Sequence, residues 1–248
     1  MCASPASRRR YLSASSVGCG VPSISPWVQY SEKIANGQNA ASGSWPWQAS
    51  LHACTGSHFR SGSLIDDNWV ITAAFCEFNP YAHAVVLGEY DQYSGAEAIQ
   101  VKTVAKTRPY SAPTHPGCNA NTFNNGITLL KLSWPAQPEP RVAPVCLPTS
   151  SAETVLLGQL NSAFSLSSPS ASSLAQHLQQ AVLPLISTSQ CMQHWGNHST
   201  ASMLCAAGVW TLIGIVSWGN HNCNARSPAV YARGPAVYAR VSQLRSRT

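Results

Sequence analysis

The fold is decided by one stretch of the sequence, Trp69-Val70-Ile71-Thr72-Ala73-Ala74-Phe75-Cys76. Its aromatic and β-branched residues, followed by small residues and a cysteine, predict a buried β-strand. Similar short apolar segments recur between turns rich in Gly, Pro, Asn and Ser, and no long helical period interrupts them. This pattern predicts an all-β domain built as a sandwich or a barrel.

The composition narrows the class of protein. Of the 248 residues, 44% are hydrophobic and 10% are charged, so the chain can bury a large core. No apolar run approaches the roughly 20 residues that a membrane-spanning helix needs. The basic clusters lie near the two ends, and no basic stripe is interleaved with aromatic residues. We therefore expect neither a nucleic-acid partner nor a membrane partner.

Nine cysteines indicate a disulfide framework, which is typical of an extracellular protein. The number is odd, so at least one thiol has no intramolecular partner. A secreted chain should begin with a signal peptide, but residues 11–17 are too polar for its apolar core. We interpret residues 1–18 as a degenerate or absent signal segment.

A set of ordered motifs extends the pattern around the opening stretch. The motifs are Cys19-Gly20-Val21-Pro22, residues 32–37, 43–51, 62–65, 72–74, 86–91 and 124–132, Val145-Cys146-Leu147-Pro148, Gly214-Ile215-Val216-Ser217-Trp218-Gly219 and residues 228–233. In this order and at these separations they resemble the chymotrypsin-like serine proteases, and among them a pancreatic chymotrypsin-like zymogen. The resemblance covers about residues 19–240 and is weakest at 150–175.

The resemblance implies a fold of two antiparallel β-barrels with the site in the cleft between them, the second barrel here being incomplete. Residues 19–33 correspond to a propeptide-like segment and residues 34–248 to the protease domain. Barrel one would span about 34–135 and barrel two about 150–241. An activating protease would cleave between Lys33 and Ile34. Disulfides Cys19–Cys146 and Cys191–Cys205 are implied in the same way.

The catalytic positions depart from the family pattern. The strand at 69–76 ends in Thr-Ala-Ala-His-Cys in the family, where the His is the general base, but Phe75 stands here. Gly126 occupies the position of the orienting carboxylate, and the loop that carries the serine is absent after Gly208. The chain has only three aspartates, Asp66, Asp67 and Asp91. The resemblance places all three in loops or strand ends away from the cleft.

Other features have two interpretations. Ser217-Trp218-Gly219 forms a substrate-backbone edge in the family, but without a pocket floor we interpret it as barrel structure first and as a peptide-binding remnant second. Cys191, His194, His198 and Cys205 offer a zinc-ligand spacing. The implied disulfide Cys191–Cys205 uses the same two cysteines and matches the sequence pattern of the family. We therefore expect no metal and no cofactor.

A tandem repeat lies near the C-terminus. Residues 228–233 and 235–240 both read Pro-Ala-Val-Tyr-Ala-Arg, separated by Gly234. Two units of this size do not make a solenoid. We interpret the repeat as a local duplication, in which the second copy runs as an extra loop or displaces the first.

The sequence leaves three hypotheses about function. The first is a catalytically inactive homologue of a chymotrypsin-like serine endopeptidase that acts, if at all, by binding a peptide or protein. The second is the active serine endopeptidase that the family implies. The third is a pseudogene product or faulty gene model without function, because the signal segment, triad, disulfides and C-terminus all depart together.

Overall fold

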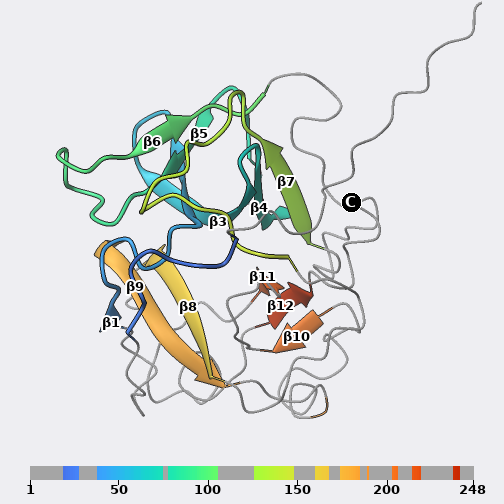
Figure 1. The fold of residues 1–248 in the computed structure, drawn as a ribbon. Helices are drawn as coiled ribbons and strands as arrows, with labels where there is room; N and C mark the ends of the chain where they lie inside the picture. Colours follow the sequence, from blue (N-terminus) through green and yellow to red (C-terminus); the bar gives the residue numbers. More distant parts are fainter. Residues whose placement is uncertain are drawn as a thin grey trace, which may run out of the picture.

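A computed structural model confirms the all-β class, with twelve strands in three sheets among the residues that it describes (Figure 1). These residues are 19–27, 38–74, 78–105, 126–147, 160–167, 174–184, 189, 203–205, 214–218 and 237–240. At 160–167, 174–175, 181–184, 203–205, 214–218 and 237–240 the structure gives the backbone without the side chains. No helix in the described residues is long and apolar enough to cross a membrane.

The first half of the chain forms a six-stranded antiparallel sheet of order β6-β5-β2-β3-β4-β7. Its strands are β2 (Gln48–Ala53), β3 (His58–Asp66), β4 (Trp69–Ala73), β5 (His83–Leu87), β6 (Gln100–Lys102) and β7 (Ile127–Lys131). The opening stretch of the sequence therefore forms β4, as predicted, between β3 and β7. The sheet encloses the main hydrophobic core, whose fully buried side chains include Leu51, Leu64, Val70, Leu87 and Leu130.

The two edges of this sheet meet beyond the ends of β6 and β7. Val104 and Leu132 form an antiparallel bridge. Beside it the Ala105 N–H donates to the Lys131 carbonyl at 2.8 Å. The sheet thus curls onto itself, and a single bridge instead of a strand ladder joins its edges.

Two smaller sheets lie below the first in Figure 1, and all their strands except β1 come from the second half of the chain. One has the order β1-β9-β8, from β1 (Gln38–Asn39), β8 (Leu160–Ser167) and β9 (Leu174–Pro184). The other has the order β10-β12-β11, from β10 (Met203–Cys205), β11 (Gly214–Trp218) and β12 (Val237–Arg240). The second copy of the tandem repeat therefore supplies the central strand of the third sheet.

The connection from β10 to β11 is unusually short. Both strands are antiparallel to β12 and flank it, so they run parallel to each other. Only residues 206–213 separate the two strands in the sequence, whereas parallel strands are normally joined by a dozen or more residues. This is the connection at which the sequence predicts the absence of the serine-carrying loop.

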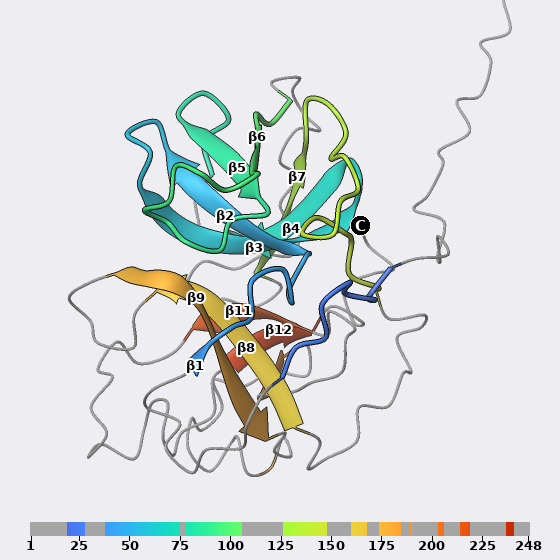
Figure 2. The ribbon, with the colours of Figure 1, turned by 60° about the vertical axis from the view of Figure 1, so that its left-hand side comes forward.

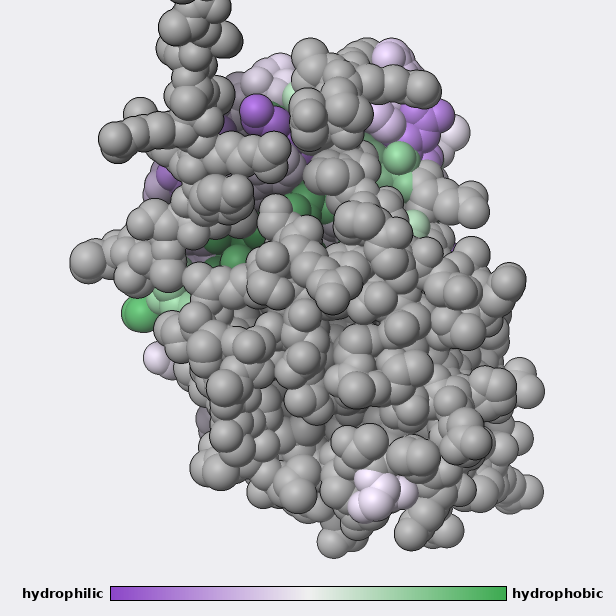
Figure 3. Space-filling model, turned by 90° about the vertical axis from the view of Figure 1, so that its right-hand side faces the viewer, coloured by the Kyte–Doolittle hydropathy of each residue, from purple (hydrophilic) through white to green (hydrophobic). Residues whose placement is uncertain are grey.

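β9 joins the two halves of the molecule (Figure 2). Leu178 belongs to the main core, and its backbone bonds to Ala40 and Tyr90, at 2.8 Å each. The buried Gln180 amide accepts a hydrogen bond from the Trp45 indole at 2.9 Å. In the space-filling view of Figure 3, described hydrophobic residues are visible toward the middle of the molecule and hydrophilic ones near its upper end. The contacts of Leu178 and Gln180 join the two halves by apolar burial and by hydrogen bonds.

Gly62 allows the close approach of β3 and β4. A Cβ atom at Gly62 would lie 2.9 Å from the Ile71 carbonyl oxygen and 2.9 Å from a Val70 methyl group. Because backbone cannot yield as a flexible side chain can, we expect Gly62→Ala to destabilise the protein by about 1–3 kcal/mol. Urea unfolding followed by tryptophan fluorescence measures this loss.

The matched control for this substitution is Gly95→Ala. A Cβ at Gly95 would meet no atom within 4 Å. The control should therefore unfold within about 0.5 kcal/mol of the wild type. Equal effects of the two substitutions would show that β3 and β4 do not pack as closely as described.

Candidate active site

The pairing of β4 with β7 brings two of the predicted catalytic positions together. In this ladder Ala73 pairs with Ile127, and the Ala74 N–H donates to the Gly126 carbonyl at 2.9 Å. Gly126 is buried and carries no side chain. Phe75 lies outside the described residues, but it follows Ala74 directly. Ala74 and Gly126 are therefore bonded neighbours, and neither the glycine nor the phenylalanine at the two predicted positions can move a proton.

The three aspartates lie elsewhere. Asp66 ends β3 and accepts the Asn68 N–H at 2.8 Å, and Asp67 follows it in the exposed turn before β4. This turn is at the opposite end of β4 from Ala74, about 16 Å away for a five-residue strand. Neither carboxylate therefore lies near Ala74 or Gly126.

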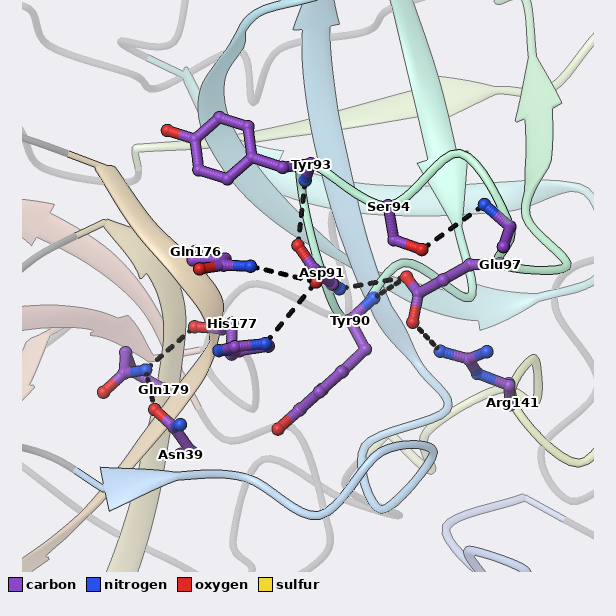
Figure 4. Close-up of polar contacts among 11 residues, drawn as sticks. Asn39, Tyr90, Asp91, Tyr93, Ser94, Glu97, Arg141, Gln176, His177 and Gln179 are labelled. Carbon is purple, nitrogen blue, oxygen red and sulfur yellow. Dashed lines mark hydrogen bonds and ion pairs between the residues drawn. The ribbon is translucent and has the colours of Figure 1, made fainter.

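Asp91 belongs to the junction with β9 (Figure 4). Its carboxylate lies 3.5 Å from His177 Nε2 and accepts the Gln176 side-chain amide at 3.2 Å. The backbone N–H of Tyr93, and then Gln176, hold the pKa of Asp91 below its usual value. Nearby, Glu97 accepts the backbone N–H groups of Tyr90 and Asp91. These carboxylates organise a loop against β9 and are not available for acid–base work.

The substrate-binding remnant is described in part. Ser217 and Trp218 lie in β11, which contacts β4 across the centre of the molecule. Val216 pairs with Tyr238 and Trp218 with Val237, so Ser217 has no partner in β12 and forms a bulge. Gly219 lies outside the described residues, as do Lys33, Ile34 and Gly208.

One of the two implied disulfides is confirmed. Cys19 and Cys146 are bonded and tether the segment at 19–27 to the first half of the chain. The Gly20 N–H reinforces this contact by donating to the Pro144 carbonyl at 2.9 Å. Cys191 lies outside the described residues and Cys205 is described by its backbone alone, so their pairing stays a prediction. Cys54 is an exposed free thiol.

A serine–histidine–glutamate cluster inside the first half was not predicted from the sequence. Ser50 Oγ lies 2.7 Å from His58 Nδ1 and 2.7 Å from His52 Nε2. The same His52 nitrogen lies 3.1 Å from Glu89 Oε2. Ser50 and His52 share one face of β2 because they are two residues apart, and β2 pairs with β3 at His52 and His58.

The geometry of this cluster excludes a catalytic relay. A base that activates serine uses one ring nitrogen for the hydroxyl and the other for the carboxylate. Here the single nitrogen Nε2 of His52 faces both Ser50 and Glu89. Ser50 is also only 1% exposed, so no substrate can reach its hydroxyl. The cluster is a buried polar network and not a displaced active site.

Burial sets the electrostatics of the network. Burial first, and then the neighbouring His52, lower the pKa of His58 from 6.5 to about 4. Burial alone would raise the pKa of Glu89, but hydrogen bonds from His52 and Ser50 outweigh it and lower the pKa below 4.5. His58 Nε2 is buried without a hydrogen-bond partner among the described residues. The network is therefore built for a neutral His58.

The described residues hold no group of three or more His, Cys, Asp or Glu side chains that could bind a metal ion. The weighed zinc ligands Cys191, His194 and His198 lie outside those residues.

Comparisons with known proteins agree with the resemblance. The protein family described as Trypsin matches residues 34–246. Trypsin of Sus scrofa is 35% identical over 224 residues, an alignment that covers 81% of this chain and 90% of that protein. Ovochymase of Halocynthia roretzi is 28% identical over 238 residues, which cover 82% of this chain and 14% of that much longer protein.

The network predicts acid sensitivity. An unfolded histidine binds a proton near pH 6.5, whereas folded His58 stays neutral down to about pH 4, so the unfolded state takes up more protons in this window. Lowering the pH from 7.5 to 5.0 should therefore cost about 2 kcal/mol of unfolding free energy through His58 alone. Glu89 adds a loss at still lower pH, as the pH falls through its lowered folded pKa.

The variant His58→Asn isolates this effect, because asparagine keeps an acceptor for Ser50 and does not titrate. Its stability should fall by about 2 kcal/mol less than that of the wild type over the same pH change. Urea unfolding at pH 8.5 and 7.5, where neither state of His58 gains protons, is the control. Parallel losses in the two proteins between pH 7.5 and 5.0 would contradict the assignment.

Proposed function

This chain belongs to the trypsin family of serine proteases, and we propose that it is a catalytically inactive member which binds an extended peptide or protein segment. Serine-protease chemistry needs a nucleophile, a base, an orienting carboxylate and oxyanion donors held in one place. In this chain the fold keeps the backbone positions of the base and the carboxylate but not the catalytic groups themselves.

A single observation carries the proposal. The β4–β7 ladder is intact up to Ala74 and Gly126, so the backbone that would present a base and a carboxylate is in register. The residues at those positions are Phe75 and Gly126, which can neither accept nor orient a proton. The catalytic groups are thus missing at positions whose backbone is kept, which differs from a site that has moved elsewhere in the fold.

No other described group supplies the missing chemistry. The Ser50 hydroxyl is buried and shares one histidine nitrogen with Glu89. The aspartates lie at the far end of β4 or at the β9 junction. A triad-free protease can retain about 10³–10⁴-fold catalysis over water through its oxyanion hole, but the sequence lacks the loop that would form one.

β11 supports the binding part of the proposal. It is paired with β12 along one edge, and no strand among the described residues pairs with its other edge. That strand carries Ser217 and Trp218 and lies beside β4. An exposed strand edge binds extended peptides through main-chain hydrogen bonds. We therefore assign the peptide-binding role to the unpaired edge of β11.

Two finer features accompany the proposal. The Cys19–Cys146 disulfide supports an extracellular location, because such bonds persist in oxidising compartments. Tethering of the segment before Lys33 supports a zymogen-like organisation, in which an activating protease cleaves between Lys33 and Ile34. The likeness to trypsin of Sus scrofa favours the second candidate, a serine-type endopeptidase, and a degenerate gene product without function is the third.

The absence of activity is tested with a fluorophosphonate probe, which labels activated serines. We expect no labelling and no cleavage of chymotrypsin-type peptide substrates, before or after treatment with trypsin. Installing the missing base and carboxylate together, as Phe75→His with Gly126→Asp, should not restore labelling, because the serine loop is still absent. Probe labelling of the wild type that a serine-protease inhibitor blocks would establish the endopeptidase instead.

The tether is tested by limited proteolysis with trypsin. After cleavage at Lys33–Ile34, the fragment containing Cys19 should stay attached on a non-reducing gel and separate only after reduction, because Cys146 holds it. In the variant Cys146→Ser the same fragment should separate without reduction. Separation from the wild type under non-reducing conditions would show that the disulfide does not form in solution.

A further inference from the structure

The N-terminal segment at 19–27 has a second attachment, at the other end from its disulfide. The backbone carbonyl of Trp27 accepts a hydrogen bond from Gln180 Nε2 at 2.9 Å and another from Gln38 Nε2 at 3.2 Å. The Trp27 side chain, in contrast, is 75% exposed. The attachment therefore recognises the backbone of the segment and not the side chain at its end.

The register of β1 and β9 builds the site that holds this carbonyl. Gln38 and Gln180 are directly paired in the ladder between the two strands. Paired residues extend their side chains on the same face of a sheet, so the two amide donors stand side by side. A carbonyl oxygen has two lone pairs and can accept from both donors. We call this pair of glutamine amides the carbonyl site.

Trp45 fixes the orientation of the buried amide in the carbonyl site. Gln180 is 1% exposed, and its Oε1 accepts the Trp45 indole N–H at 2.9 Å. Because an indole nitrogen is only a donor, it must face the amide oxygen, which directs the amide nitrogen toward Trp27. If the Trp27 carbonyl leaves, a buried donor loses its partner. Such a loss costs more than breaking an exposed hydrogen bond.

The segment at 19–27 passes from one half of the molecule to the other. Its start is held in the first half by the disulfide to Cys146 and by a hydrogen bond to the Pro144 carbonyl. In its middle, a Cβ atom at Gly43 would lie 3.1 Å from Ile24 Cδ1, so the glycine leaves room for this side chain. Its end reaches the carbonyl site on β1 and β9. Figure 2 shows the segment, in dark blue, descending from the first half toward the smaller sheets.

We propose that residues 19–27 form a strap that fastens the two halves together, and that the carbonyl site holds the end of this strap independently of the disulfide. The two hydrogen bonds to Trp27 together favour the attached end by about ten- to hundred-fold. Opening Cys19–Cys146 under native conditions therefore frees the start of the strap and leaves its end bound. Because the ligand of the site is a backbone carbonyl, the side chain at position 27 is free to vary.

Cleavage after Trp27 by added chymotrypsin tests the strap. The protease must bind the carbonyl of the bond that it cuts in its own oxyanion hole, and here the two amides occupy that carbonyl. Gln180→Met removes the buried donor and keeps a side chain of similar length. The initial rate of cutting after Trp27, measured by mass spectrometry of the fragments, should rise about three- to ten-fold. Cutting after Tyr81, which is 64% exposed in the first half, should not change.

The matched control is the same substitution one residue earlier. Gln179 lies on the opposite face of β9, where its amide donates to Asn39 Oδ1 at 2.6 Å (Figure 4). Gln179→Met therefore removes a contact between β1 and β9 but leaves the carbonyl site intact. Cutting after Trp27 should stay within about two-fold of the wild-type rate in this variant. The same result is expected when Cys19→Ser and Cys146→Ser together remove the disulfide.

Three results would overturn the proposal. The first is an unchanged rate after Trp27 in Gln180→Met, and the second is equal acceleration after Trp27 and Tyr81, which indicates general loosening. The third is a disulfide-free protein cut after Trp27 as fast as Gln180→Met, because the disulfide alone then holds the strap. Where Gln180→Met does not fold, Gln38→Ala decides at the less buried donor: cutting about two-fold faster after Trp27 alone supports the carbonyl site, and an unchanged rate contradicts it.

Discussion

β4 is bonded along both sides, to β3 through pairs such as Gly62–Thr72 and to β7 through pairs such as Val70–Leu130. Its Val70 side chain is completely buried in the main core. Because hydrogen bonds and apolar packing both hold this strand, its end at Ala73 is fixed relative to the start of β7. The two adjoining positions, Ala74 and Gly126, are therefore neighbours whatever side chains the next residues carry. The fold at this point therefore depends on β4 and β7 themselves and not on the residue types at positions 75 and 126.

Sequence reasoning succeeded where the information is local or carried by ordered motifs. The β-branched run predicted β4, and the resemblance implied the Cys19–Cys146 disulfide. It missed the Ser50 cluster because Glu89 is 37 residues from His52 and reaches it only through the pairing of β2 with β5. Ser50 and His52 at alternating positions of an apolar strand were the available signal. It left open which repeat copy enters the sheet, since identical sequences cannot be distinguished by pattern.

The second half of the molecule is held differently from the first. The first half has a curled six-stranded sheet around one core, whereas the second has two three-stranded sheets. The part of β9 whose side chains are described reaches the main core through Leu178 and binds Trp45 through the buried Gln180 amide. Hydrogen bonds of buried polar groups are costly to break singly, because the partner is left unsatisfied. Such contacts fix the relative position of the halves.

On the proposed assignment of Phe75 and Gly126 to catalytic positions, the two substitutions are physically coupled. Gly126 is buried beside Ala74, so an ionised carboxylate there would need a charged or hydrogen-bonding partner. In the family that partner is the histidine at the position of Phe75. Once phenylalanine stands there, an aspartate at 126 is left as a buried charge without its partner, which is strongly destabilising. Glycine removes that penalty and keeps the backbone contact. On that assignment, Phe75 and Gly126 are better understood as one coupled pair of substitutions than as two separate losses.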